Sequence, residues 1–269
     1  MSEASPGLLF ELDGSIATLT LNRPHEGNAM DTEMIGDLER AWQRIDADPA
    51  IRVAILTGTG ERHFCTGASV GSLEIGSLTL QNRPNSAVNR FSPRMVQVSK
   101  PVICAVNGLV NGGGLHFVAE SDIVIASRKA QFMDTHVSVG QVSGLESISV
   151  ARRVGLGAAL LMGLVGKAYR MDAERAHQLG LVDLLEDDAA SALARARELA
   201  QAICQNSPQA MALTKRAIWG ATEMPEPTAS SVGWELLKSH WAHPDFKEGP
   251  QAFAEKRAPV WNPDPNARG

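Results

Sequence analysis

Two glycine-bearing segments of the chain could stabilise a developing negative charge with backbone groups. Residues 64–70 (FCTGASV) place a Gly-Ala pair after a predicted strand, and residues 107–116 place three glycines between a predicted strand and a predicted helix. A helix N-terminus has N–H groups without intrahelical partners, so two such turns facing each other could direct two donors at one carbonyl oxygen. That arrangement is an oxyanion hole. The alternative is that the glycines only allow tight turns and close packing.

One imidazole is placed to act at the second turn. His116 follows Gly113 by three residues, so in a helix that begins at the glycines its side chain lies on the face of the turn and points into the site. Imidazole, with a reference pKa near ~6.5, can act as acid or base at neutral pH without the tuning that a carboxylate needs. Glu120 is close enough to orient or charge His116, although a solvent-exposed helix pair explains the same spacing equally well.

Other catalytic motifs are incomplete. Residues 57–60 (TGTG) lack the third glycine of a dinucleotide fingerprint, and residues 161–168 lack the first glycine and the Ser/Thr of a phosphate loop. Residues 140–144 (GQVSG) have one residue too many before the serine for a nucleophile elbow. The three cysteines are odd in number and form no C-x-x-C pair, which argues against a disulfide framework or a zinc site and favours a reducing compartment. We interpret Cys65, beside the first turn, as a packing residue.

The segments around these turns alternate between strand and helix patterns. The expected strands, all short and apolar, cover residues 8–12, 16–21, 53–57, 102–106 and 123–126. Asp31 is expected to cap a helix that ends near residue 48 and carries an apolar stripe. Residues 76–89 have little periodicity and are expected to form a loop or a broken helix beside a site. The alternation predicts an α/β fold.

The last third of the chain is mainly helical in pattern. The expected helices are one capped by Asp172 and stopping at Gly180, one opened by Ser207-Pro208, and two over residues 228–240 and 248–256. One last strand is expected at residues 181–185. We therefore expect a core formed by residues 1–200 and a helical C-terminal region formed by residues 201–269.

Composition excludes several classes of partner. The 269 residues include 25 Lys and Arg against 30 Asp and Glu, a net charge of −5, and 44% are hydrophobic. This balance, with no basic stripe, argues against nucleic acid or an anionic membrane surface as a partner. No apolar run approaches the ~18 residues of a membrane span, and the first residues do not resemble a signal peptide. We expect a cytoplasmic protein with one sizeable core.

Five ordered motifs resemble the enoyl-CoA hydratase/isomerase (crotonase) superfamily over about residues 8–258. They are ILTG with FCTGA at 55–68, KPVICAVNG at 100–108, GGG with SDI at 112–123, RMDA with A and GLV at 170–182, and FAEKR at 253–257. The resemblance implies a spiral of repeated β-β-α turns with a C-terminal helical region that mediates trimerisation. A homotrimer, or a hexamer formed by two trimers, is the implied assembly.

The resemblance also implies a ligand and a site. The family binds acyl-CoA thioesters and stabilises an enolate with two backbone N–H groups, which by motif match fall on Ala68 and Gly113. Coenzyme A, as part of the substrate, is expected to lie along residues 23–29 and the turn at residues 67–70. The implied substrate-binding residues are Arg23, Ala29, Gly67, Ser69, Val70 and Gly112. No metal and no redox cofactor are implied.

The chain departs from the family at the catalytic positions. Family hydratases use two glutamates, and the matching positions here are His116 and His136, so neither glutamate is present. The following loop, residues 140–147, carries Glu146 where the family often has glycine, which makes it the best carboxylate candidate. Asp134 flanks His136 but points the other way if that segment is extended. A ring at both catalytic positions predicts a chemical role for at least one. The remaining histidines are interpreted as surface or packing residues: His25, His63, His177, His240 and His243.

Three functions are compatible with these residues. In an enoyl-CoA hydratase-like lyase, His136 or Glu146 activates water toward the β-carbon, His116 handles the α-proton, and Ala68 and Gly113 bind the enolate oxygen. In a carbon-carbon bond hydrolase, resembling the β-diketone hydrolases of the superfamily, His136 and Glu146 direct water at a ketone and the same donors accept the enolate. The third function is a non-catalytic acyl-CoA-binding scaffold, against which the two titratable rings count.

Overall fold

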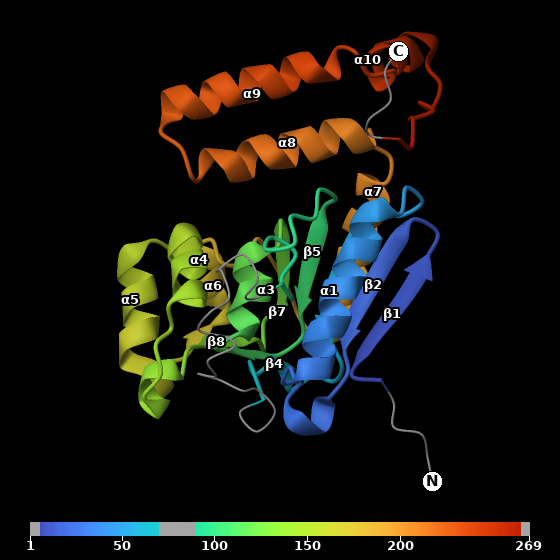
Figure 1. Cartoon of the computed structure of the whole chain (residues 1–269). Helices are drawn as coiled ribbons and strands as arrows, with labels where there is room; N and C mark the ends of the chain where they lie inside the picture. The colour runs from blue at the N-terminus through green and yellow to red at the C-terminus, as the bar shows by residue number, and fades with distance from the viewer. Residues whose placement is uncertain (1–5, 70–89, 265–269) are drawn as a thin grey trace.

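A computed structural model describes residues 6–69 and 90–264 of the chain (Figure 1). A six-stranded sheet has the order β1-β2-β3-β5-β7-β10 and is parallel except for the β1–β2 hairpin. Its strands are β1 (Leu8–Asp13), β2 (Ile16–Leu21), β3 (Val53–Gly58), β5 (Val102–Val106), β7 (Ile123–Ser127) and β10 (Leu184–Glu186). A four-stranded sheet has the order β4 (His63–Cys65), β6 (Leu109–Asn111), β8 (Gln131–Met133) and β9 (Met171–Asp172). After the β1–β2 hairpin, which lies wholly in the larger sheet, each successive strand pair contributes one strand to each sheet. The predicted α/β spiral of β-β-α turns is therefore confirmed.

The helices cover both faces of the larger sheet. They are α1 (Thr32–Ala47), α3 (Gly114–Glu120), α4 (Leu145–Val154), α5 (Leu156–Val165), α6 (Ala173–Gln178), α7 (Ala189–Ile203), α8 (Pro208–Ala221), α9 (Glu226–His240) and α10 (Asp245–Glu255). Short 3-10 helices are η1 (Pro24–Glu26), η3 (His136–Val139) and η4 (Gly166–Ala168). Figure 1 shows α1 on one face of the sheet, and α7 packs against the opposite face over β3, β5 and β7. Every residue of β3 and β5 is buried, as expected for parallel strands covered on both sides.

Capping side chains that the sequence predicts set the start of several helices. Asp31 accepts a hydrogen bond from the backbone of α1, Asp172 caps α6 and Ser207 caps α8, all as expected. The strand expected at residues 181–185 is shorter and later, at Leu184–Glu186. The reason is that the backbone N–H groups of Leu181 and Val182 donate to the carbonyl of Ala176, which closes the end of α6.

The C-terminal helices lie apart from the sheets. In Figure 1, α8 and α9 run side by side above the larger sheet, and α10 follows them. The expected boundary after residue 200 falls inside α7, which ends at Ile203 and packs on the sheet. The division into a core and a C-terminal region stays a prediction, and the loop expected at residues 76–89 lies outside the described residues.

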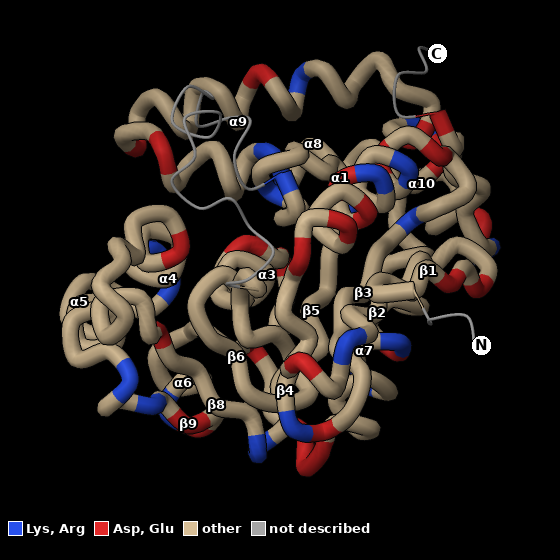
Figure 2. Tube along the Cα trace, turned by 60° about the horizontal axis from the view of Figure 1, so that its bottom comes forward, with Lys and Arg blue, Asp and Glu red and all other residues tan. Residues whose placement is uncertain are grey.

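Charged residues of both signs are spread along the described part of the chain. Over the described trace, acidic and basic residues are interspersed, and α5 shows neither along its length (Figure 2). None of the helices in the described part of the chain combines the length and the apolar character needed to cross a membrane.

Candidate functional site

The turns that follow β4 and β6 lie against each other. Gly67 has φ +95°, and a Cβ at this position would lie 3.0 Å from the backbone nitrogen of Gly113 and 3.1 Å from the carbonyl oxygen of Asn111. A Cβ on Gly113 would in turn lie 3.7 Å from the backbone nitrogen of Ala68. Glycine is therefore required at Gly67 for both its dihedral angle and its surroundings. The close approach places the backbone nitrogens of Ala68 and Gly113 on two turns that contact each other.

The hydrogen bonds that fix these turns use neither of the two N–H groups. The backbone N–H of Met30 donates to the carbonyl of Gly67 at 2.8 Å, and that of Ser69 donates to the carbonyl of Met30 at 2.8 Å. In this parallel bridge the N–H of Ala68, between the two bonds, points away from Met30. Gly113 precedes the first residue of α3. Within residues 6–69 and 90–264, neither the Ala68 nor the Gly113 N–H has an acceptor.

His136 lies between two carboxylates. Its Nδ1 is 2.7 Å from Oδ1 of Asp134, which also accepts the backbone N–H of His136 at 3.0 Å. Its Nε2 is 3.4 Å from Oε1 of Glu146. An extended segment would point Asp134 away from His136, but the chain turns into η3 after β8, so that condition is not met and the two side chains contact each other. The predicted pair of His136 and Glu146 is brought together, and sequence reasoning missed the role of Asp134.

The ring of His136 lies beside the glycine turn. A Cβ on Gly112 would lie 3.2 Å from Cε1 of His136, so the ring covers the residue next to Gly113. The parallel pairing of β6 with β8 brings their carboxyl ends together. The Asn111 side chain at the end of β6 also donates to the hydroxyl of Thr135 at 3.0 Å. The imidazole therefore lies beside the turn that carries the Gly113 N–H.

The carboxylates change the proton affinity of the imidazole. The hydrogen bond to Asp134 raises the pKa of His136, burial opposes this, and the charge of Glu146 adds to the increase. Burial of Asp134 opposes its ionisation, but hydrogen bonds from His136 and Ser143 outweigh it and lower the pKa of Asp134. An ionised Asp134 can only accept, so Nδ1 of His136 keeps its proton. Nε2 is then the atom that gains or loses one.

His116 belongs to a second cluster. Its Nδ1 is 2.7 Å from Oε1 of Glu120, and both side chains are 3% exposed, so the open choice between a buried pair and a solvent-exposed one is resolved for the buried pair. Ser149 donates to the same oxygen of Glu120 at 2.8 Å, and Ser92 donates to the other oxygen. Burial opposes ionisation of Glu120, yet the hydrogen bonds from His116, Ser92 and Ser149 lower the pKa of Glu120. Phe91 packs edge-on against the His116 ring at 5.5 Å.

The two histidine clusters meet on α4. This helix contributes Glu146 to the first cluster and Ser149 to the second, three residues apart and so on neighbouring positions of one face. Nothing in the sequence indicates the serine contacts, because a hydroxyl has no spacing rule that points to a distant carboxylate. The contact between α3 and α4 brings them together.

The expected coenzyme A segment is ordered by its own side chains. Arg23 Nη1 donates to the carbonyl of Ala29 at 3.0 Å and lies 2.7 Å from Asp31 Oδ2, so this guanidinium holds the turn in shape. The turn leads to Met30, which bridges to Ala68. Of the other residues implied in binding, Gly67, Ser69 and Gly112 lie in the two turns described above, and Val70 lies outside the described residues.

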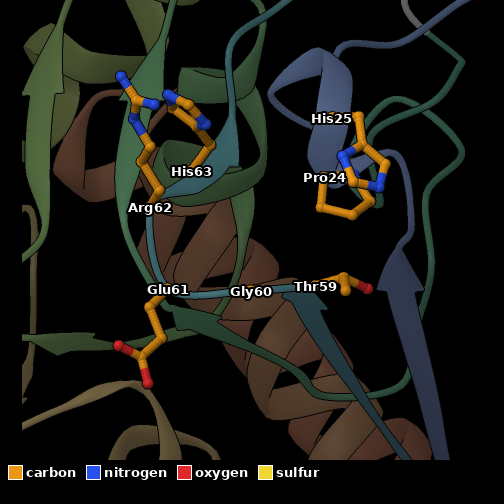
Figure 3. Close-up of a pocket in the computed structure, with 7 residues that line it drawn as sticks. All are labelled: Pro24, His25, Thr59, Gly60, Glu61, Arg62 and His63. Carbon is orange, nitrogen blue, oxygen red and sulfur yellow. The ribbon is translucent and has the colours of Figure 1, made fainter.

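A cavity of about 310 Å³ opens at the start of the same segment. It lies between η1 and residues 59–63. Figure 3 shows Arg62 and His63 on one side of it and His25 on the other, while Glu61 points away. Sequence reasoning took both histidines for surface or packing residues and so missed this cavity. The separation of residues 25 and 63 in the chain gives no signal of it.

Metal and thiol chemistry have no support in the described part of the chain. Among residues 6–69 and 90–264, no group of three or more His, Cys, Asp and Glu side chains could hold a metal ion. Burial raises the pKa of the Cys65 thiol to about 12, so this residue is a packing residue.

Comparisons with known proteins identify the family of this chain. The model of the enoyl-CoA hydratase/isomerase family matches residues 11–264. The chain is 35% identical over 257 residues to (E)-benzylidenesuccinyl-CoA hydratase from Thauera aromatica, covering 94% of this chain and 97% of that protein. It is 31% identical over 256 residues to 1,2-epoxyphenylacetyl-CoA isomerase from Escherichia coli, covering 94% and 97%.

Solved structures give the same result. An enoyl-CoA hydratase/isomerase from Mycobacterium paratuberculosis superposes with a TM-score of 0.87 at 36% identity, covering 97% of this chain and 100% of that one. An enoyl-CoA hydratase from Bacillus anthracis superposes with a TM-score of 0.86 at 27% identity, covering 96% and 100%. The chain is an acyl-CoA enzyme that belongs to the enoyl-CoA hydratase/isomerase (crotonase) family.

Proposed function

We propose that this enzyme is an enoyl-CoA hydratase-like lyase that adds water to an α,β-unsaturated acyl-CoA thioester. The observation that carries the proposal is the position of His136, held between Asp134 and Glu146 and beside the Gly112 turn. An imidazole beside two unpaired N–H groups can activate water next to a thioester whose oxygen those groups bind. Hydratases among the similar proteins support the reaction class.

The two histidines have separate roles in the proposed reaction. Water gives a proton to Nε2 of His136 while its oxygen bonds to the β-carbon, with Glu146 orienting the water. The π electrons move to the thioester oxygen, where the N–H groups of Ala68 and Gly113 stabilise the enolate. His116 then supplies the proton that the α-carbon takes up, and the proton that His136 received from water replaces it before the next turnover. The electrostatic contribution of the two donors falls on the transition state, because negative charge develops on that oxygen only during the reaction.

A carbon-carbon bond hydrolase is the second candidate. Nε2 of His136 and Oε1 of Glu146 lie 3.4 Å apart and both accept, so they can direct one water at a ketone carbon as well as at an alkene. Cleavage of a β-diketone or a β-keto acyl-CoA then leaves an enolate in the same two-donor site. The absence of both family glutamates favours keeping this candidate.

Coenzyme A would bind from the basic cavity to the glycine turns. The side chains of His25 and Arg62 make no ion pair within the described residues, and each can face a phosphate group. Burial and the neighbouring Arg62 lower the pKa of His63, which disfavours the charged form of this ring. The segment from His25 to Met30 connects the cavity with the turn at Ala68, which is the path expected for the pantetheine arm.

We propose a homotrimer, or a hexamer of two trimers, as the assembly. On α5, Leu156 and Leu164 are 71% and 70% exposed, and Trp234 of α9 and Trp241, which follows that helix, are exposed as well. Large exposed apolar faces mark interaction surfaces. If one apolar face of each subunit contacts the other apolar face of the next subunit, the repeated contact can close into a ring. Light scattering of the purified protein tests the number of subunits in the assembly.

The cytoplasmic location of the protein stays a prediction.

One assay separates the candidate functions. Purified protein is incubated with crotonyl-CoA while the enoyl absorbance is followed, and in parallel with a cyclic β-diketone and a β-keto acyl-CoA while acid product is followed. Loss of enoyl absorbance that depends on His136 supports the hydratase. Acid product alone supports the hydrolase and overturns the hydratase. Binding of coenzyme A without turnover of any substrate supports a scaffold.

A further inference from the structure

We propose that Asp134 is a positioning residue that fixes the orientation of His136 and the proton on its Nδ1, so that Nε2 acts on water. Through Ser143, the same carboxylate also fixes the start of α4, where Glu146 faces Nε2. The inference rests on the proposed water addition. It adds a residue that the assignment of His116, His136 and Glu146 does not contain.

The carboxylate of Asp134 has donors on both oxygens. Its side chain is 1% exposed. Oδ1 accepts the backbone N–H of His136 at 3.0 Å and lies 2.7 Å from Nδ1, and Oδ2 accepts the hydroxyl of Ser143, with Ser147 at 3.5 Å. A buried carboxylate is costly unless such bonds satisfy it. The four donors therefore hold Asp134 ionised and in one orientation.

The two ring nitrogens of His136 have different surroundings. The 2.7 Å contact of Nδ1 with Asp134 is a normal charge-assisted hydrogen bond, whereas 3.4 Å from Nε2 to Glu146 is longer than a normal one. The proton of the neutral ring therefore resides on Nδ1. Nε2 and the Glu146 oxygen then present two acceptors to one place, and a water molecule there can donate to both.

Asp134 also affects where Glu146 points. Ser143 and Ser147 lie within 2.7 Å of each other through their hydroxyl oxygens and flank Glu146 in sequence. The second oxygen of Glu146, Oε2, accepts the N–H of Leu145 at 3.1 Å, so its orientation depends on the first turn of α4. Because Ser143 ties that turn to Asp134, one carboxylate orders both members of the His136–Glu146 pair.

The charged groups around His136 determine how its pKa changes when Asp134 is neutralised. Asp134 faces it from its own segment and Glu146 faces it from α4. Lys167 of η4 is exposed, and α5 carries no titratable side chain. The hydrogen bond that His136 donates to Asp134 is the largest influence that raises the pKa of His136. Neutralising Asp134 must therefore lower that pKa.

The test combines Asp134→Asn with a direct measurement on the ring. Histidine labelled with ¹³C and ¹⁵N reports the pKa and the tautomer of His136 by NMR without substrate, with His136→Gln used to assign the signal. We expect Asp134→Asn to lower the pKa of His136, to move the acidic limb of kcat/KM to lower pH, and to lower kcat by at least about 10-fold with little change in KM. Asp172→Asn, which removes an exposed capping carboxylate of α6, is the control and should leave all three unchanged.

A second variant keeps the inference testable if Asp134→Asn does not fold. Ser143→Ala keeps the Asp134 charge and removes only its anchor, and we expect it to lower kcat several-fold at unchanged KM. Folded Asp134→Asn with the pKa and tautomer of the wild-type ring overturns the inference, and so does Ser143→Ala at wild-type kcat if Asp134→Asn does not fold. If the wild-type protein hydrates no enoyl-CoA, the proposed function fails, and the NMR titration alone still decides the role of Asp134.

Discussion

Replacing Gly67 with alanine should separate the two N–H donors. The residue has φ +95°, where an L side chain costs about 1–3 kcal/mol. The new Cβ would lie 3.0 Å from the nitrogen of Gly113 and 3.1 Å from the oxygen of Asn111. Both neighbours are backbone atoms, so the turns must move apart by a few tenths of an ångström. Loss of one donor's alignment should lower kcat by about 10²–10³-fold.

The control for this variant is Gly180→Ala. Gly180 has φ +83°, and a Cβ there would meet only the oxygen of Arg153 at an ordinary 3.5 Å. Both variants should lower Tm by roughly 2–10 °C, because backbone strain of about 1–3 kcal/mol is common to them. Only Gly67→Ala should lower kcat for crotonyl-CoA. A kcat within about threefold of wild type in Gly67→Ala, with Tm lowered as in the control, would refute the role of these turns as donors.

Four further outcomes follow from the same contacts. His136→Gln and His116→Gln should each lower kcat at least about 100-fold in steady-state assays, and near-normal rates in both would contradict general acid–base roles. Because the pKa of His136 is raised and its neutral form is the base, the acidic limb of kcat/KM should have its midpoint above the reference value of ~6.5 in a pH profile. Glu120→Gln should lower the free energy of unfolding by about 1–3 kcal/mol in urea. Since the folded-state pKa of Glu120 is lowered, its stabilisation is present above the unfolded value of ~4.3 and is lost as pH falls through the folded one. Arg62→Ala should raise KM for acyl-CoA with little change in kcat, and more so at low salt than at high salt.

Much of the fold is readable because its signals are local. The period of the hairpin and the buried strands, the Asp31 cap and the apolar stripe with Met34, Leu38 and Trp42 on α1 each depend on neighbouring residues. The last strand was placed early because the closing hydrogen bonds at Leu181 form only after α6 has folded. A strand pattern cannot distinguish that turn from an extended segment.

The site is readable only in part, for a related reason. The glycine turns and both histidine positions follow from motif order, and Glu146 follows from an unusual residue in a loop. The orientation of Asp134 cannot be read from the sequence, because alternation of side chains holds for a strand and fails where η3 begins. The contacts of Ser92 and Ser149 with Glu120 join segments far apart in the chain, so only the folded arrangement contains them.

The two histidines differ in solvent exposure, and this difference indicates which step of the proposed reaction each one serves. Each ring engages a carboxylate through Nδ1, Asp134 in one case and Glu120 in the other, so Nε2 is the atom on the opposite side of both rings. The His136 side chain is 21% exposed, whereas that of His116 is 3% exposed. Water is a reactant in the proposed reaction and must reach the base that activates it, while a proton destined for a substrate carbon is best kept from solvent. This difference favours His136 as the group that activates water and His116 as the group that serves the α-carbon.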